Sequence, residues 1–170
     1  VGRSLGSMFV EKAEREKMEV ENPLFHEIGS VISAACLAHD MGNPPFGHSG
    51  EDAISQFFKK NNHLNLETEL TEGQWKDFIQ FDGNANAFRL LSHQFNGRRE
   101  GGFALTYTTL ASIVKYPYES VFTTKPKFGF FQSEKSIFER IGNELGLIQQ
   151  STDPLRFVRH PLVFLVEAAD

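Results

Sequence analysis

The chain has 170 residues, of which 40% are hydrophobic and 17 are phenylalanine, and its formal net charge is −5. These values predict one folded domain with an aromatic core. They exclude a disordered chain and a general basic field for nucleic acid or an anionic membrane. The single cysteine excludes an intrachain disulfide, and we expect a cytoplasmic protein. No apolar run of about 18 residues that could span a membrane is present.

Apolar residues recur at spacings of three and four through most of the chain, whereas strand patterns are weak, which predicts an all-α fold. We expect helices at residues 4–19, 24–40, 50–60, 84–95, 105–115, 133–145 and 161–170. Residues 61–80 are polar and irregular and are expected to form a surface excursion. Loops are expected at 97–102 and 118–132, where glycine and proline interrupt the pattern.

Both ends of the chain have the pattern of helices without capping residues. Residues 1–10 read as the middle of an amphipathic helix, and residues 167–170 stop within a helix-like apolar run. Since the ends of intact domains are usually polar and frayed, we expect a piece of a longer protein.

The most informative stretch is the run from His39 to Glu51, HDMGNPPFGHSGE, which holds two imidazoles and two carboxylates in 13 positions. The pair His39-Asp40 falls in the last turn of the 24–40 helix. Such a pair can offer a neutral nitrogen and an anionic oxygen to one divalent ion. A stiff turn then delivers His48 and Glu51, which can handle protons beside a metal-bound water, with Glu51 orienting the His48 ring. The run therefore predicts a metal-assisted hydrolytic site.

Local signals place this run between two helices. Gly42 is expected to end the 24–40 helix in the left-handed conformation, and Pro44 disfavours helix at the residue before it. Ser49 is expected to be the N-cap of the next helix, in a sequence that resembles a capping box.

Each of these residues also has a purely structural alternative. His39 can serve as a helix C-cap or a hydrogen-bonded core residue, and His48 can be an ordinary loop residue. Glu51 can be a first-turn carboxylate that the helix dipole favours. A His-Asp pair alone is weak evidence, so the metal interpretation depends on the whole run.

Four later blocks follow this run: FDGNANA at 81–87, KYP at 115–117, KFGFFQSE at 127–134 and EAAD at 167–170. Together, and in this order, the blocks resemble the HD-domain phosphohydrolases and, within them, the deoxyguanosinetriphosphate triphosphohydrolases (dGTPases). Each block alone is modest evidence, but jointly they are specific and span nearly the whole chain. The resemblance implies that residues 1–170 form part of an HD-type helical bundle, truncated at both ends.

The resemblance assigns a metal set and a catalytic pair. It implies that His39, Asp40 and Asp170 are ligands of one divalent ion, Mn or Mg first, with Fe, Ni, Co and Zn as alternatives. His48 and Glu51 match the catalytic His and Glu of the family. The sequence does not decide whether His48 acts as acid or base.

The resemblance also implies a nucleotide site. Its positions that match nucleotide-contacting residues are Asn84, Lys115, Tyr116 and Lys127. Lysines suit a triphosphate, whose negative charges need cationic partners. By residue type alone, both lysines would be solvated surface charges and Asn84 a helix N-cap.

The chain departs from the family pattern at several points. The first His of the metal set lies upstream in the family, and His26 is a poor substitute because it lies about 20 Å from His39 along the predicted helix. Its absence implies weak metal binding, or none, by this chain alone. Asp82 and Asn86 stand where the family more usually has Glu and Gln. Substrate residues that follow EAAD in the family are absent.

The function implied is metal-dependent hydrolysis of a deoxynucleoside triphosphate, such as dGTP, to deoxynucleoside and triphosphate. One alternative is a nucleotide-sensing module without turnover, and another is an HD hydrolase of a different phosphate ester. A homo-oligomer is expected by the same resemblance, and no membrane partner. Base preference, and whether single-stranded nucleic acid is an effector, are not decided by these residues.

Overall fold

The computed structural model describes residues 1–18, 23–61, 65–97 and 100–170. The end of the first predicted helix at residue 19, and residues 62–64 and 98–99 of the predicted loops, lie outside this part. The described part is mostly helical, which confirms the helical class. Its α-helices are α1 (Gly2–Arg15), α2 (Ile28–Ala38), α3 (His48–Lys60), α4 (Leu66–Glu69), α5 (Glu72–Ile79), α6 (Gly83–Ser92), α7 (Tyr107–Ile113), α8 (Lys135–Glu144) and α9 (Val163–Ala169). Short 3-10 helices are η1 (Pro23–Glu27), η3 (Ser120–Phe122) and η4 (Gln132–Glu134).

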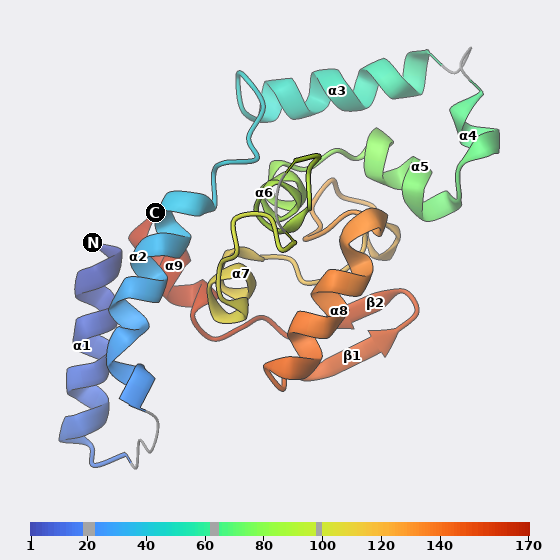
Figure 1. Ribbon diagram of the computed structural model, residues 1–170. Coiled ribbons are helices and arrows are strands. Elements are labelled where there is room, and N and C mark those ends of the chain that lie inside the picture. The colour runs from blue at the N-terminus through green and yellow to red at the C-terminus, as the bar shows by residue number, and fades with distance from the viewer. Residues whose placement is uncertain (19–22, 62–64, 98–99) are drawn as a thin grey trace.

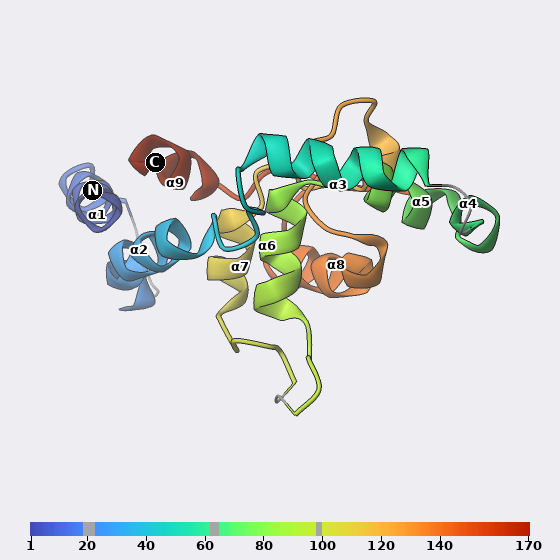
Figure 2. The same cartoon turned by 90° about the horizontal axis from the view of Figure 1, so that it is seen from above.

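One group of helices consists of α1, α2 and α9, a second includes α6 and α8, and α7 joins the two groups. Figures 1 and 2 show α1, α2 and α9 side by side at one end of the molecule, and these three helices contact one another. The α7 helix packs on α2 and α9 from one side and on α6 and α8 from the other. The α3 helix begins after the loop that follows α2, runs away from α2 and contacts α5 (Figure 1). This arrangement brings the end of α2, the start of α3 and the end of α9 to one region.

The core is aromatic, as the phenylalanine content predicts. Phe138 of α8 is 1% exposed and contacts three other buried rings. Its ring centroid lies 5.5 Å from Phe88, 4.6 Å from Phe130 and 5.9 Å from Phe157. Rings at these separations combine a large buried apolar area with favourable edge and offset contacts. The cluster fixes α6, α8 and the 128–131 segment relative to one another.

A small β-hairpin, which the sequence did not predict, is added to the otherwise helical fold. Strands β1 (Gln149–Thr152) and β2 (Leu155–Phe157) pair antiparallel, with Thr152 opposite Leu155. The β1 strand is almost entirely exposed, so it has no alternating apolar pattern that sequence analysis could detect. Leu155 and Phe157 of β2 are buried in the core, and this tertiary packing stabilises the short hairpin.

The region predicted as an irregular excursion contains α4 and α5, which corrects that prediction. The α5 helix begins at a capping box, in which Thr71 accepts a hydrogen bond from the Gln74 backbone and the Gln74 side chain accepts one from the Thr71 backbone. This reciprocal pair satisfies two donors that the start of the helix would otherwise leave free. The pattern T-x-x-Q was therefore a usable signal for α5.

Two local predictions around the 39–51 run are wrong. Gly42 does not adopt the left-handed conformation; instead, a Cβ at this position would lie 2.0 Å from the Ala87 backbone nitrogen. Gly42 therefore lets the loop after α2 contact the backbone of α6. Ser49 is not the N-cap of α3, because the helix begins at His48 and Gly47 caps it with φ of 54°. This early start places His48 in the first turn.

Candidate metal and phosphate site

A cavity of about 170 Å³ lies where the loop after α2 and the ends of α3, α6, α7 and α9 meet. All of the predicted site residues except Tyr116 line it. They are His39, Asp40, His48, Glu51, Asn84, Lys115, Lys127 and Asp170. Residues from distant parts of the sequence thus share one cavity.

The three predicted metal ligands form a cluster. The Nε2 atom of His39 lies 3.4 Å from Oδ2 of Asp40 and 3.3 Å from Oδ1 of Asp170. One ligand atom from each of the three residues lies within 4.8 Å of the others. His39 is the C-cap of α2 and Asp170 is the C-cap of α9. The packing of these two helices therefore creates the cluster. His26 does not belong to it and lies instead 3.6 Å from Glu14.

The chemistry of these groups fits a divalent cation. The Nδ1 atom of His39 lies 2.8 Å from the Cys36 carbonyl, so Nδ1 carries the proton and donates, because a carbonyl only accepts. The buried Nε2 atom has no hydrogen-bond partner among the described residues, and it faces two carboxylates. A nitrogen lone pair beside two carboxylates is repulsive unless a proton or a metal ion lies between them. Nδ1 hydrogen-bonded to a carbonyl is also how proteins orient a ligating histidine.

Among the described residues, no hydrogen bond or ion pair joins Glu51 to the His48 ring, which the prediction of an orienting role for Glu51 requires. Glu51 is 8% exposed, its Oε1 accepts a hydrogen bond of 2.8 Å from the Gly83 backbone, and its Oε2 lies 3.7 Å from Lys127 Nζ. His48 is exposed on the first turn of α3 and faces the same cavity. The structure thus places Glu51 as a link between α3, α6 and Lys127, not as the orienting partner of the His48 ring.

Asn84 and Lys127 line the same cavity, and both lie beside Asp82, a residue outside the predicted set. Asp82 is the N-cap of α6, so the alternative of Asn84 as N-cap is wrong. The Oδ1 atom of Asp82 accepts from the Asn84 backbone at 3.0 Å and from Asn84 Nδ2 at 2.7 Å, and it lies 3.8 Å from Lys127 Nζ. Burial raises the pKa of Asp82, although these hydrogen bonds and the Lys127 charge act to lower it.

Lys115 is ion-paired with a second residue that sequence reasoning did not single out. Its Nζ lies 2.6 Å from Glu167 Oε1, and this hydrogen bond raises the pKa of Lys115. The other oxygen of Glu167 lies 3.3 Å from Arg159. Tyr116 does not line the cavity, and its ring lies 5.8 Å from the Lys115 ammonium and 5.7 Å from the Arg159 guanidinium. The Tyr116 ring therefore makes cation–π contacts with both side chains. The EAAD block was the only signal for Glu167.

The charges of the described lining residues also indicate a cation. Four carboxylates, from Asp40, Glu51, Glu167 and Asp170, face the cavity with only two lysines. An anionic phosphate group would be repelled by this surplus of negative charge. A divalent ion among the carboxylates would remove the surplus, so a phosphate group would fit this cavity better with such an ion bound.

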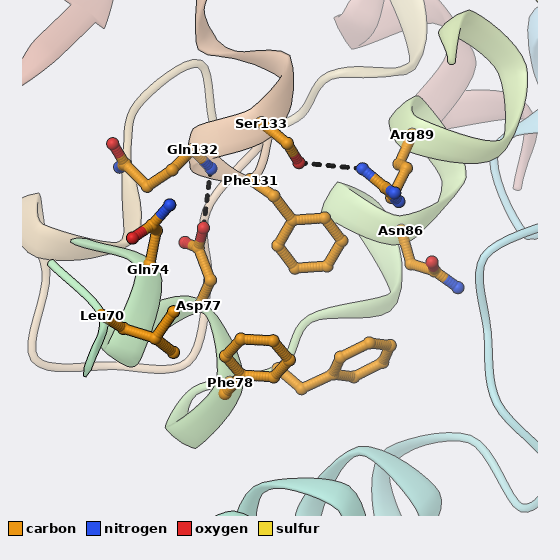
Figure 3. Close-up of a pocket in the computed structure, with 10 residues that line it drawn as sticks. Leu70, Gln74, Asp77, Phe78, Asn86, Arg89, Phe131, Gln132 and Ser133 are labelled. Carbon is orange, nitrogen blue, oxygen red and sulfur yellow. Dashed lines mark hydrogen bonds between the residues drawn. The ribbon is translucent and has the colours of Figure 1, made fainter. Parts of the chain in front are cut away.

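A larger cavity of about 460 Å³ lies between α5, α6 and residues 131–133 and contains none of the predicted site residues (Figure 3). Phe78, Phe131 and the buried carboxyl of Asp77 line it. Asp77 accepts hydrogen bonds from the Ser120 hydroxyl at 2.7 Å and the Gln132 backbone at 2.6 Å. Burial raises the pKa of Asp77 to about 7. By size alone this cavity would be the better candidate for a binding site, but the side chains that can hold a metal ion line the smaller cavity.

Comparison with known proteins places the chain beside one group of hydrolases. It is 44% identical over 179 residues to a deoxyguanosinetriphosphate triphosphohydrolase-like protein of Pseudomonas aeruginosa and 42% identical over 186 residues to one of Synechocystis. It is 28% identical over 207 residues to a deoxyguanosinetriphosphate triphosphohydrolase of Yersinia pestis. Each match covers 100% of this chain but only 39%, 41% and 38% of the relative. No family model matches the chain.

These matches confirm the resemblance to the dGTPase family that the sequence blocks indicate. The chain spans about two fifths of the length of the curated relatives it matches. Among the described residues, no helix combines the length and the apolar character needed to cross a membrane.

Proposed function

We propose that this chain contributes the metal and phosphate side of an active site that hydrolyses a deoxynucleoside triphosphate, dGTP first, to deoxynucleoside and triphosphate. The observation that carries the proposal is the meeting of His39, Asp40 and Asp170 in the cavity that also holds Lys115 and Lys127. The printed names of the relatives, which are deoxyguanosinetriphosphate triphosphohydrolases or similar to them, support the choice of substrate.

In this proposal His39 Nε2 and the carboxylates of Asp40 and Asp170 hold one divalent ion, Mn or Mg. When bound, such an ion polarises a phosphate oxygen and lowers the pKa of a coordinated water. The Cys36 carbonyl fixes the His39 ring, and Asn43 Nδ2 donates a hydrogen bond of 2.9 Å to Asp40 Oδ1, which leaves Oδ2 toward the cluster. His39 and Asp40 are therefore oriented before any ion binds.

Lys115 and Lys127 bind the phosphate chain. Their side chains are 42% and 29% exposed, so each keeps an open side although a carboxylate lies on the other. The lysine charges hold the substrate so that its α-phosphorus faces the metal cluster, which is catalysis by positioning. His48, on the exposed first turn of α3, exchanges protons with the reacting oxygen atoms or with solvent.

The test is triphosphate release from dGTP by a full-length version of the protein with Mn²⁺ or Mg²⁺, compared with a chelator control. We expect metal-dependent release of triphosphate, and loss of release in His39→Ala. Tight binding of dGTP with no release would replace this proposal with a nucleotide-sensing module. Hydrolysis of other phosphate esters in preference to dGTP would change the substrate class. A homo-oligomeric state stays a prediction, which size-exclusion chromatography with light scattering can measure.

A further inference from the structure

The Asp82 carboxylate has more partners than a helix cap needs. It is 0% exposed, and a cap requires only the hydrogen bond from the Asn84 backbone. Its Oδ1 also accepts from the Asn84 side chain, and its Oδ2 accepts a hydrogen bond of 3.1 Å from the Phe128 backbone. One oxygen of Asp82 thus binds Asn84, and the other binds the backbone next to Lys127. Asn84 and Lys127 both line the cavity.

The junction around Asp82 is tightly packed. A Cβ on Gly83 would lie 2.4 Å from Asn43 Oδ1 and 2.9 Å from Glu51 Oε1, so a side chain there would displace both of these oxygens. The Gly83 N–H donates to Glu51, and Lys127 Nζ lies 3.7 Å from Glu51 Oε2 and 3.8 Å from Asp82 Oδ1. Three segments of the chain therefore meet at this point, and the two carboxylates hold Lys127 from one side.

We propose that Asp82 is a positioning residue that sets the Asn84 amide and the Lys127 ammonium on the wall of the phosphate cavity. Because Asn84 Nδ2 donates to Asp82, the Asn84 oxygen is left as an acceptor for a ligand hydroxyl or a water. Because two carboxylates hold Lys127, its remaining donors are left for an anionic oxygen. This inference rests on the proposed function of the cavity, and it adds a residue that does not itself line it.

The two oxygens of Asp82 make asparagine a sharp test. Each oxygen accepts at least one backbone N–H, whereas an asparagine has one oxygen and one donor nitrogen. In Asp82→Asn, one N–H must therefore face another donor. Asp77→Asn is the matched control, because Asp77 is also buried, with 7% exposed, but its partners are one N–H and the Ser120 hydroxyl, which can reverse and accept. Asp82→Glu keeps both oxygens and is the conservative variant.

The experiment has two measurements on the full chain. The first is the NMR signals of the Asn84 side-chain amide and the Phe128 backbone amide without ligand. The second is calorimetric binding of inorganic triphosphate with Mg²⁺, below the melting temperature of every variant. We expect Asp82→Asn to shift these signals and to weaken binding about tenfold. Asp82→Glu should retain more affinity than Asp82→Asn, and Asp77→Asn should bind as the wild type does.

Two results would overturn the inference. One is an Asp82→Asn chain in which the Asn84 and Phe128 signals are unchanged. The other is a folded Asp82→Asn chain that is less stable but binds triphosphate as tightly as the wild type, which would make Asp82 a residue of the fold only. If the wild type binds no triphosphate, the proposed function fails, whereas the NMR measurement still decides whether Asp82 orients Asn84.

Discussion

The Nε2 atom of His39 lies 3.3 Å from Oδ1 of Asp170, although these residues end two different helices, α2 and α9. The cluster they form with Asp40 exists only while those helices stay packed. The α2 helix is held mainly by α1 and α7, and α9 contacts all three. The geometry of the cluster therefore depends on the packing of this helix group, and each variant of the cluster needs a folding control.

Asp170→Asn tests the metal set. The amide keeps the shape of the side chain but removes the charge, so we expect Mn²⁺ affinity to fall by about tenfold or more. Titration calorimetry or Mn²⁺ electron paramagnetic resonance measures this affinity. Asp52→Asn, an exposed carboxylate on the first turns of α3, is the control. Equal Mn²⁺ affinity in Asp170→Asn and the wild type would remove Asp170 from the ligand set.

His48→Ala tests proton transfer. His48 is exposed, so its removal should leave the melting temperature nearly unchanged. We expect kcat for triphosphate release to fall by about 100-fold or more with little change in KM. The neighbouring exposed Ser49→Ala is the control and should keep wild-type kcat. A kcat of His48→Ala within error of the wild type would exclude His48 as acid or base.

Gly42→Ala tests the contact between the loop after α2 and α6. An added Cβ would lie 2.0 Å from the Ala87 nitrogen and 2.1 Å from the Gly83 carbonyl, both backbone atoms that cannot rotate away. We expect a loss of about 2 kcal/mol or more in the free energy of unfolding, measured in urea. Gly47→Ala has open space but a backbone with φ of 54° and ψ of −128°, so its cost of about 1–3 kcal/mol should come from backbone strain alone. A free energy of unfolding for Gly42→Ala within error of the wild type would contradict this packing.

Asp77 should make stability depend on pH. Its pKa is raised to about 7 in the fold from 3.8, so the folded state binds a proton that the unfolded state releases between these values. The contribution of Asp77 to stability is therefore full below about pH 4 and is lost as pH rises toward 7. Relative to Asp77→Asn, the wild type should lose up to about 1.4 kcal/mol per pH unit in this window.

Urea unfolding of both proteins at several pH values measures this difference. Subtraction of the Asp77→Asn curve removes the pH dependence that the other titratable groups contribute to both proteins. A difference between the two proteins that stays constant from pH 4 to 7 would show that Asp77 is ionised in the fold.

Much of the candidate site could be predicted from residue types and order. The His39-Asp40 pair after an apolar helix, the later lysine blocks and the terminal EAAD are local features, and the structure brings nearly all of them to one cavity. The partner of Glu51 could not be predicted, because it is the Gly83 backbone, which approaches through the fold. In the sequence, Asp82 stands out only because the family more usually has Glu at this position. Its burial and its hydrogen bond from the Phe128 backbone depend on the tertiary structure.

The sequence by itself determined the helical class, the position of most helices and the residue types available for chemistry, because spacing, capping and charge act over a few neighbouring residues. It did not determine the β1–β2 hairpin, whose strands are stabilised by the burial of Leu155 and Phe157. Only the tertiary structure decided which carboxylate meets which partner. His39 faces Asp170, Glu51 binds Gly83 and Lys127, and Lys115 binds Glu167, because helix packing sets these distances.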